Sequence, residues 1–301
     1  MPSLQRGILQ TLLYYDIWEY PLTAKELYAF LPGTEMSFEE FSACLAKDGP
    51  GPMVAEHEGF YFLRSRPRSV VEERNTRHRH ARTMWKMARV STHIIKRFPF
   101  VRGVFVSGDL SKDATTPASD VDFFILTSPG RLWIARAMLT VFKKTFLLNR
   151  KKFFCLNYFV TTDHLLVEEH NIYAATEIGH LKPLYGSGLF NKYMTANRWI
   201  REYFPNFDTL LLPSVKPNDR RSVLQIVLEA PFALLPADAL DDALLQAMRR
   251  VWRNRYPDLD DAARARMFRS TQQESRAYGG DFQEKILNLY EQKLKEHGVD
   301  D

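Results

Sequence analysis

The sequence is poor in cysteine and has no long hydrophobic run. It contains two cysteines, Cys44 and Cys155, far apart and without zinc-site spacing, so we expect reduced, buried thiols and no disulfide framework. The N-terminus lacks a basic region followed by an apolar stretch and a cleavage site, so no signal peptide is expected. Arg136 and Glu229 interrupt the longest apolar segments, which are shorter than the roughly 20 residues of a membrane-spanning helix. We therefore expect a cytoplasmic protein without membrane contact.

The composition is that of an ordinary globular protein. Hydrophobic residues make up 45% of the chain and charged residues 26%, so disorder is not expected. A length of 301 residues is sufficient for two or three modules with a real core.

Positive charge is concentrated between Arg64 and Arg102. The whole chain has a formal net charge of +5, yet this short segment holds twelve Lys or Arg against Glu72 and Glu73. Such a concentration favours a polyanionic partner, either nucleotide phosphate or nucleic acid. A solvated helix face is an equally good interpretation. The twelve are Arg64, Arg66, Arg68, Arg74, Arg77, Arg79, Arg82, Lys86, Arg89, Lys96, Arg97 and Arg102.

The first 66 residues have the pattern of three short helices followed by a hairpin. Thr23 with Glu26, and Ser37 with Glu40, have the spacing of capping boxes at helix N-termini. This order predicts a winged-helix-like module at residues 1–66. Such a module serves either to bind DNA or to contact another protein.

The rest of the chain changes character twice. A long basic connecting helix is expected at residues 67–98, and residues 99–190 alternate strand and helix patterns, which predicts an α/β domain around a mixed sheet. Residues 191–301 are predicted to form a helical C-terminal region. The expected fold class is therefore α+β.

Two aspartates, Asp120 and Asp122, begin a strand that continues as Phe123–Leu126. Side chains two residues apart on a strand share a face, so both carboxylates project together. Because two neighbouring carboxylates repel each other and are costly to desolvate, we expect a cation between them. Mg²⁺ (or Mn²⁺) suits one or two carboxylates completed by water and phosphate. The structural alternative is that they cap the strand or bind Arg of the basic helix.

A phosphate-binding loop is expected just before this strand. Gly108 stands at the end of the preceding strand, with Ser107 before it and Ser111 after it. Backbone N–H groups at such a strand-to-helix turn can approach a phosphate closely.

This arrangement resembles the motif of the polymerase-beta-like nucleotidyltransferase superfamily. The motif is a glycine-serine pair after a strand, a loop, and then two acidic residues flanking one apolar residue on the next strand. The resemblance covers residues 100–160. A wider resemblance, to a bacterial group in which a winged-helix-like segment precedes this domain, rests on four short motifs. They are Tyr20–Thr23, Asn157–Phe159, Ala175–Glu177, and Ala196 and Asn197 with Trp199.

The resemblance implies transfer of a nucleoside monophosphate from an NTP to an acceptor, with pyrophosphate leaving. Asp120 and Asp122 would hold the metal ions. The acceptor would be a small molecule, a protein or an RNA, and the basic segment could also contact nucleic acid. The residues implied to contact the triphosphate are Ser107, Gly108, Ser111 and Lys112.

Two positions depart from the family's pattern. Asp109 stands where the family has serine, and its charge repels a triphosphate. Asn157 stands at the third catalytic position, where an amide can hydrogen-bond but cannot act as a base. The alternative is thus a degenerate transferase that binds nucleotide or nucleic acid as a non-catalytic regulator. Acids that could supply the missing carboxylate are Asp163, Glu168, Glu169 and Glu177.

Overall fold

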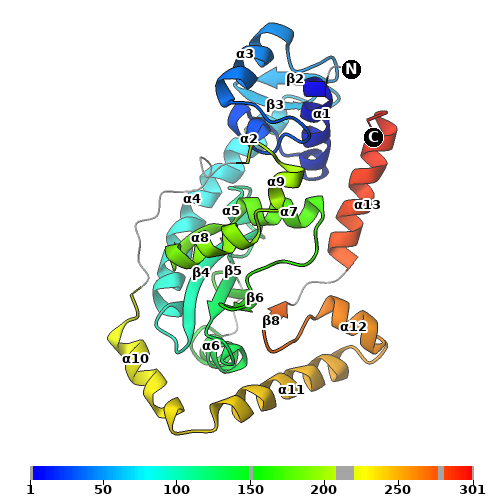
Figure 1. Cartoon of the computed structure of the whole chain (residues 1–301). Helices are drawn as coiled ribbons and strands as arrows, with labels where there is room; N and C mark the ends of the chain where they lie inside the picture. The colour runs from blue at the N-terminus through cyan, green and yellow to red at the C-terminus, as the bar shows by residue number, and fades with distance from the viewer. Residues whose placement is uncertain (1–2, 149–151, 208–219, 277–280, 300–301) are drawn as a thin grey trace.

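Two open β-sheets organise the chain, one small and one large (Figure 1). This computed structural model describes residues 3–148, 152–207, 220–276 and 281–299. Helices cover both sheets, so the mixed α+β class predicted from the sequence is confirmed.

The small sheet lies in the N-terminal module. Its strands are antiparallel and have the order β1-β3-β2. Both predicted capping boxes are present, because Thr23 and Ser37 accept from the N–H groups of Glu26 and Glu40, whose side chains accept in return. The predicted three helices and hairpin are therefore found, with β1 in addition. The elements are α1 (Ser3–Tyr15), the 3₁₀ turn η1 (Asp16–Trp18), β1 (Leu22–Thr23), α2 (Ala24–Ala29), α3 (Phe38–Asp48), β2 (Val54–His57) and β3 (Phe60–Leu63).

Helix α4 (Ser69–Ile95) connects this module to the large sheet (Figure 1). Its first turn packs Val70 and Val71 against Phe62 of β3. Its later turns pack Met84 and neighbouring apolar residues into the core under the large sheet. The long helix predicted for this segment is confirmed.

Several basic side chains of the Arg64 to Arg102 segment are used inside the protein. Arg74 is buried, and its guanidinium lies 3.7 Å from the centre of the Tyr20 ring. The exposed side chains of Arg82, Lys86 and Arg89 share one face of α4, and they remain as candidate contacts for a polyanion. The internal ion pairs are Arg66 with Asp16 and Glu19, Arg74 with Glu26, Arg77 with Glu73, and Arg102 with Glu229.

The large sheet has five strands in the order β7-β4-β5-β6-β8. Strands β5 and β6 are parallel and the other neighbours antiparallel. The three central strands were predicted from their apolar patterns and are confirmed. The strands are β4 (Val101–Ser107), β5 (Asp122–Thr127), β6 (Cys155–Thr161), β7 (Lys182–Tyr185) and β8 (Glu274–Arg276).

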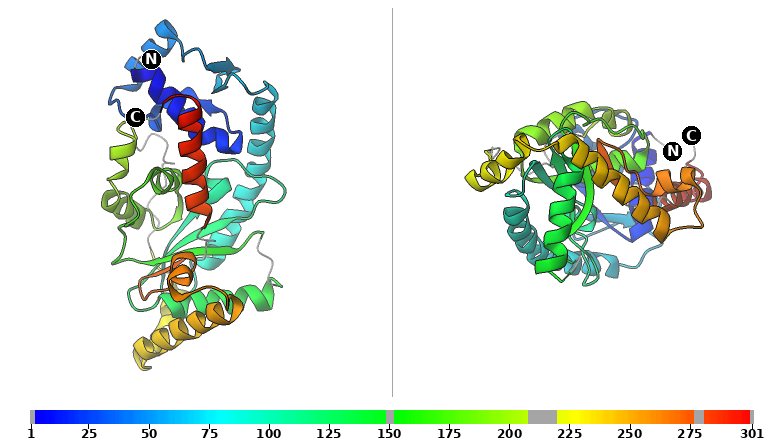
Figure 2. Two further views of the ribbon diagram at one scale, coloured as in Figure 1. Left: turned by 90° about the vertical axis from the view of Figure 1, so that its right-hand side faces the viewer. Right: turned by 90° about the horizontal axis from the view of Figure 1, so that it is seen from below.

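Helices cover both faces of the large sheet (Figures 1 and 2). On one face, α4 and α6 (Leu132–Phe146) pack against Phe123 and other inward residues. On the opposite face, α7 (Ile172–His180) and α8 (Ser187–Ala196) pack against Phe124. Because successive strand residues alternate between faces, Phe123 and Phe124 belong to different cores.

Two short edge strands were not predicted. Strand β7 lies in the predicted α/β domain beyond the three central strands, and β8 lies in the region 191–301, whose other described elements are helical as predicted. Strands of four and three residues are too short to show a clear alternating pattern. Strand β8 is also polar. The other elements of the region are α9 (Ile200–Tyr203), α10 (Val223–Glu229), the 3₁₀ turn η3 (Ala230–Ala233), α11 (Ala237–Arg255), α12 (Asp261–Met267) and α13 (Asp281–Glu296).

Helix α13 packs on the N-terminal module rather than on its sequence neighbours (Figure 2). Tyr290 of α13 meets Tyr14 of α1 edge to face, with ring centres 5.3 Å apart. Lys293 Nζ lies 2.6 Å from the carboxylate of Asp16. The predicted C-terminal region is therefore not a separate unit, since it completes the large sheet and also contacts the first helix.

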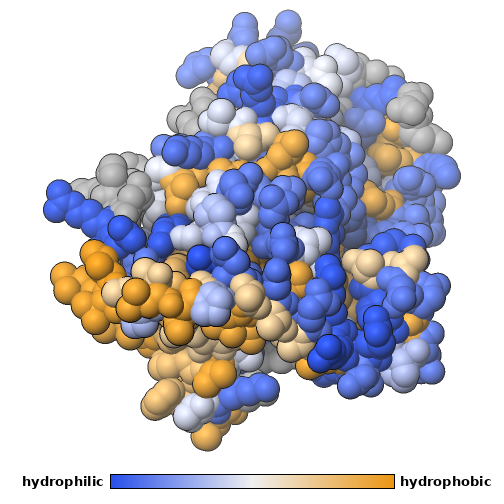
Figure 3. Space-filling view, turned by 60° about the horizontal axis from the view of Figure 1, so that its bottom comes forward, coloured by the Kyte–Doolittle hydropathy of each residue, from blue (hydrophilic) through white to orange (hydrophobic). Residues whose placement is uncertain are grey.

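A hydrophobic surface is exposed over α10, η3 and the start of α11 (Figure 3). Val223, Val227 and Leu234 are among its exposed side chains. Among the described residues, no helix alone has the length and hydropathy to cross a bilayer. The bent pair formed by α10 with η3 and α11 meets that test by length and composition.

The Asp16 carboxylate gives a test of the contact between the two chain ends. It is 7% exposed and binds both Arg66 and Lys293. We expect Asp16→Ala to lower the free energy of unfolding by about 2 kcal/mol, because Lys293 loses its partner and Arg66 keeps only the exposed Glu19. Glu19→Ala is the matched control: Glu19 also binds Arg66 but is 47% exposed, so its loss should cost under about 1 kcal/mol. Urea denaturation measures both, and equal losses would contradict this account.

Candidate functional site

Asp122 is the first residue of β5, whereas Asp120 lies two residues before the strand, which corrects the expectation that both aspartates stand on it. The register partners of Asp122 are Ser107 on β4 and Cys155 on β6. Val121, between the aspartates, is fully buried, whereas both carboxylates are half-buried. The two carboxylates are nevertheless close enough for the charge of Asp120 to act on Asp122.

Negative charge surrounds Asp122. Burial raises the pKa of its carboxyl group to about 6, and a hydrogen bond from the Cys155 thiol partly opposes that rise. The charges of Asp120, Asp109 and Glu177 raise the pKa further. In the part of the chain that the structure describes, neither Asp120 nor Asp122 forms an ion pair with Lys or Arg. The alternative that an arginine of the basic helix neutralises the pair therefore gains no support.

Gly108 is required by the position of the Asp122 carboxylate. Its φ of +66° lies in the left-handed region, and a Cβ added there would lie 2.6 Å from Asp122 Oδ2. The backbone of Gly108 therefore approaches the carboxylate more closely than any other residue type would allow.

The other side chains predicted to contact phosphate differ in whether they already have partners within the protein. The Ser107 Oγ is buried and has no hydrogen-bond partner among the described residues. Ser111 donates its hydroxyl proton to the Gly108 carbonyl at 2.8 Å. Lys112 Nζ lies 2.5 Å from Glu177 Oε1. Of these three, Ser107 alone lacks a partner among the described residues, whereas Ser111 and Lys112 already have partners within the protein.

The position at which the resemblance implies a third carboxylate carries no acid on β6. Asn157 stands in a register shift between Leu156 and Tyr158, and it is half-buried. The residue opposite Asp122 is Cys155, which sequence reasoning overlooked. Burial raises the pKa of the Cys155 thiol to about 12, so it stays protonated and donates to Asp122. Both cysteines are free but half-buried, which corrects the expectation that they are fully buried.

Glu177 is the acid that the fold brings toward the aspartate pair. It lies on α7, and its charge acts on Asp122. Asp163 is exposed, while Glu168 and Glu169 bind Arg269 instead. Glu177 was one of four candidate acids and part of the Ala175–Glu177 motif, but choosing it over the other three requires the packing of α7 over the sheet.

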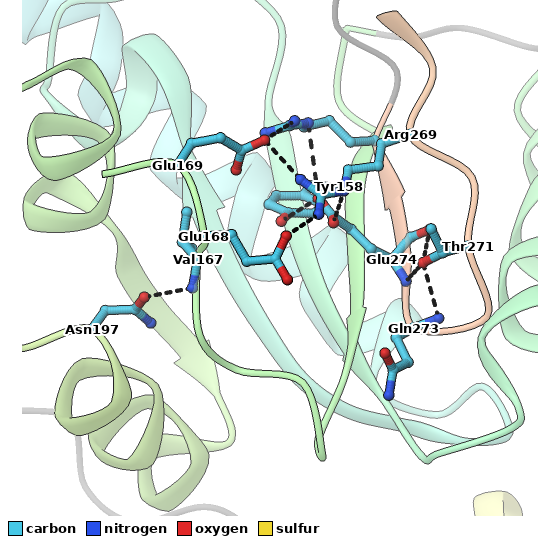
Figure 4. Close-up of polar contacts among 10 residues, drawn as sticks. Tyr158, Val167, Glu168, Glu169, Asn197, Arg269, Thr271, Gln273 and Glu274 are labelled. Carbon is cyan, nitrogen blue, oxygen red and sulfur yellow. Dashed lines mark hydrogen bonds and ion pairs between the residues drawn. The ribbon is translucent and has the colours of Figure 1, made fainter. Parts of the chain in front are cut away.

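A cavity of about 900 Å³ begins beside Ser107, the register partner of Asp122. It extends over Phe124 of β5 and Tyr158 of β6, with Glu177 in its wall. A polar network forms part of the lining (Figure 4): the Tyr158 hydroxyl donates to Glu274 Oε1 at 2.7 Å, and Arg269 Nε lies 2.7 Å from Glu274 Oε2. Helices α11 and α12 supply further lining residues.

Asn197 holds the loop before α7 in place, and Figure 4 shows its contact with Val167. Asn197 accepts from the Val167 N–H at 2.8 Å and donates to the Leu165 carbonyl at 2.7 Å. Its amide is fully buried and holds the loop that carries Glu168 and Glu169. Asn197 therefore has a structural role that explains its place in the Ala196 to Trp199 motif.

The oxygen ligands of Asp120 and Asp122 suit a hard cation that takes the rest of its ligands from water and substrate. Within the described ranges, no three His, Cys, Asp or Glu side chains are grouped so as to hold a metal ion. Asp120 and Asp122 alone match Mg²⁺, which commonly takes one or two carboxylates and completes its shell with water and phosphate. The protonated Cys155 is not a suitable ligand, because metals bind the thiolate.

Comparison of the chain with protein-family models, curated proteins and solved structures finds no match. The geometry around Asp120, Asp122 and Gly108 is therefore the main evidence on function.

The Gly108 contact gives a test with a matched control. Gly108→Ala and Gly59→Ala both place alanine at positive φ, at +66° and +77°, but the Gly59 site is open. We expect Gly59→Ala to cost about 1 kcal/mol of unfolding free energy and Gly108→Ala about 3 kcal/mol, because only the second adds a clash. Chemical denaturation measures both. Equal costs would mean that the Asp122 carboxylate is not held against Gly108.

The raised pKa of Asp122 predicts a pH effect in metal-free buffer with chelator. The carboxyl binds its proton more tightly when folded (pKa about 6) than at the unfolded value of 3.8, so stability should fall as pH rises between these values. Asp122→Asn should therefore be more stable than wild type at pH 7, by up to about 3 kcal/mol, and equal near pH 4. Asp163→Asn, an exposed control, should change neither value. A gain for Asp122→Asn that does not vary with pH would refute this.

Proposed function

We propose that the protein is a metal-dependent nucleotidyltransferase. The observation that carries the proposal is the pair Asp120 and Asp122, unpaired with any described cation, packed against the obligatory glycine Gly108. The strand sequence supports it: β4 leads through the single-turn helix α5 (Gly108–Ser111) to antiparallel β5, and α6 then leads to β6, parallel to β5. The order agrees with the motif of the resemblance, in which a strand and a loop precede the strand that carries the acids.

In the proposed reaction Asp120 and Asp122 hold Mg²⁺ or Mn²⁺. The metal would stabilise the charge on the attacking and leaving oxygens of an in-line displacement at the α-phosphorus of an NTP. The Gly108 N–H and the Ser107 hydroxyl are placed to donate hydrogen bonds to phosphate oxygens. The strong local negative potential around Asp122 favours cation binding at this end of the sheet.

Glu177 is the proposed acceptor of the hydroxyl proton. It lines the cavity and binds Lys112 at 2.5 Å. Lys112 is one of the residues implied to contact the triphosphate, so a bound triphosphate would compete with Glu177 for the ammonium group. Glu177 would then be released to accept a proton from the acceptor.

The N-terminal module is proposed to be winged-helix-like and to communicate with this site. Its β1-β3-β2 sheet and three helices support the first part. The Tyr20 hydroxyl donates to the Lys112 carbonyl, next to the residue pair Lys112 and Glu177. A shift of Tyr20 in the module would therefore move the backbone of Lys112, the proposed triphosphate contact.

A second candidate function is nucleotide binding without transfer. It is favoured by one observation: β6 presents Cys155 and Asn157 where a third carboxylate would stand. In that case the chain binds a metal–nucleotide complex and releases no pyrophosphate.

An assay of nucleotide transfer separates these functions. The protein is incubated with the four NTPs labelled at the α-phosphate, Mg²⁺ or Mn²⁺ and a cell extract, and labelled products and pyrophosphate are measured. We expect wild type to give both and Asp120→Asn/Asp122→Asn to give neither, since the metal is no longer held. Glu177→Gln should retain NTP binding and lose 10²- to 10⁴-fold in rate, as expected for loss of a general base.

Calorimetry with Mg²⁺ and a non-hydrolysable NTP supplies the control. Binding that needs Asp120 and Asp122, without pyrophosphate release, would select the second candidate. Equal labelling by wild type and the Asp120→Asn/Asp122→Asn variant would reject the catalytic assignment, and lack of any nucleotide binding would reject both functions.

A further inference from the structure

The cavity that begins at Ser107, next to Gly108 and the aspartate pair, extends far across the sheet. From Ser107 of β4 it passes Tyr158 of β6 and reaches Arg276 of β8, at the far edge of the sheet. Its volume of about 900 Å³ is that of a site for a small organic molecule. Its far wall comes from α11, α12 and the segment leading to β8.

Arginine dominates this far wall. Four acids also line the cavity, but three have cationic partners: Glu169 binds Arg269 and Arg276, Asp261 binds Arg264, and Glu177 binds Lys112. By contrast, Arg253 and Arg266 are exposed to the cavity without any ion pair to a described residue. The lining arginines are Arg249, Arg253, Arg264, Arg266, Arg269 and Arg276.

Three buried polar atoms of the lining lack a hydrogen-bond partner among the described residues. They are Ser107 Oγ at the aspartate end, and Arg264 Nε and Ser270 Oγ at the far end. A buried donor left unpaired costs about 1 to 3 kcal/mol, so the wall of this cavity is held at some cost to stability. Two of the three lie on the arginine side of the cavity.

Aromatic rings supply the apolar part of the lining. Tyr158 and Tyr173 line the cavity near α7, and Trp252 and Phe268 line it near α12, stacked on each other with centres 4.3 Å apart. Flat apolar surfaces beside free guanidinium groups suit a ligand with a compact apolar body and an anionic group.

We propose that this cavity is the acceptor site and that the acceptor is a small molecule carrying a phosphate or carboxylate group. The inference rests on the proposed function. The anionic group binds at Arg253 and Arg266, and the acceptor hydroxyl points toward Asp122. The hydroxyl oxygen forms a bond to the α-phosphorus of the NTP, and the bond from that phosphorus to the bridging oxygen breaks. Pyrophosphate leaves with the electron pair, and the hydroxyl proton passes to Glu177.

Three probes that share a six-membered aromatic ring test the proposal: phenyl phosphate, benzoate and benzyl alcohol. Calorimetry at low salt is expected to show that wild type binds at least one of the two anions ten times more tightly than benzyl alcohol. The stronger of the two identifies the anionic group. Equal affinities for all three probes would overturn the proposal.

Two double variants show whether the anion binds in the cavity. Arg253→Ala/Arg266→Ala should weaken anion binding at least tenfold and leave the binding of Mg²⁺ with a non-hydrolysable NTP unchanged. Arg250→Ala/Arg255→Ala removes the same charge from exposed positions of α11 outside the cavity lining, and it should change neither. Equal losses in both variants would indicate a general charge effect and would overturn the proposal.

Asp122→Asn separates this inference from the function on which it rests. We expect it to abolish Mg²⁺-dependent nucleotide binding while leaving anion affinity within twofold of wild type. If the nucleotide result holds and wild type shows no preference for anions, the acceptor inference fails and the transferase proposal stands. If nucleotide binding is unaffected, the transferase proposal fails, and with it the assignment of the cavity to an acceptor.

Discussion

The constraint on which the site depends is the close approach of the Asp122 carboxylate to the Gly108 backbone. It fixes the turn from β4 into α5 and holds a charged group where burial and three neighbouring acids oppose its ionisation. A fold without a use for negative potential at this point would be more stable with an amide there. Local instability of this kind is typical of functional sites, where groups are held for chemistry rather than for stability.

The same site also depends on parts of the chain that are distant in sequence. Strand β8 supplies Glu274, which is 3% exposed and accepts from Tyr158, and Arg276, which lines the cavity. The N-terminal module reaches it through Tyr20, and α13 fastens that module by Lys293 and Asp16. The aspartate pair, the cavity wall and the N-terminal module are therefore linked by direct contacts.

Much of the central architecture could be predicted from local patterns. The capping residues Thr23 and Ser37 placed two helices, and the apolar runs placed β4, β5 and β6. The spacing of Asp120 and Asp122 predicted two neighbouring carboxylates, and the charge of Asp120 does act on Asp122, although Asp120 lies before the strand. What could not be predicted depends on tertiary contacts. Cys155 became the partner of Asp122 because of a register shift at Asn157, and Glu177 came close through helix packing. Strand β8 is polar, and the ion pairs of its buried Glu274 with Arg269 and Arg276 leave no hydrophobic periodicity in the sequence.

Because β8 lies near the end of the sequence, the large sheet is completed late in synthesis. Tyr158 and Glu274 are 116 residues apart, so β6 is synthesised long before its outer neighbour. Until then the backbone groups along one side of β6 have no partner, and such an unpaired strand readily recruits a strand from another molecule. A nascent or proteolytically shortened chain that stops within α12 would consequently be prone to aggregate, and chaperone protection during synthesis would matter most over this interval.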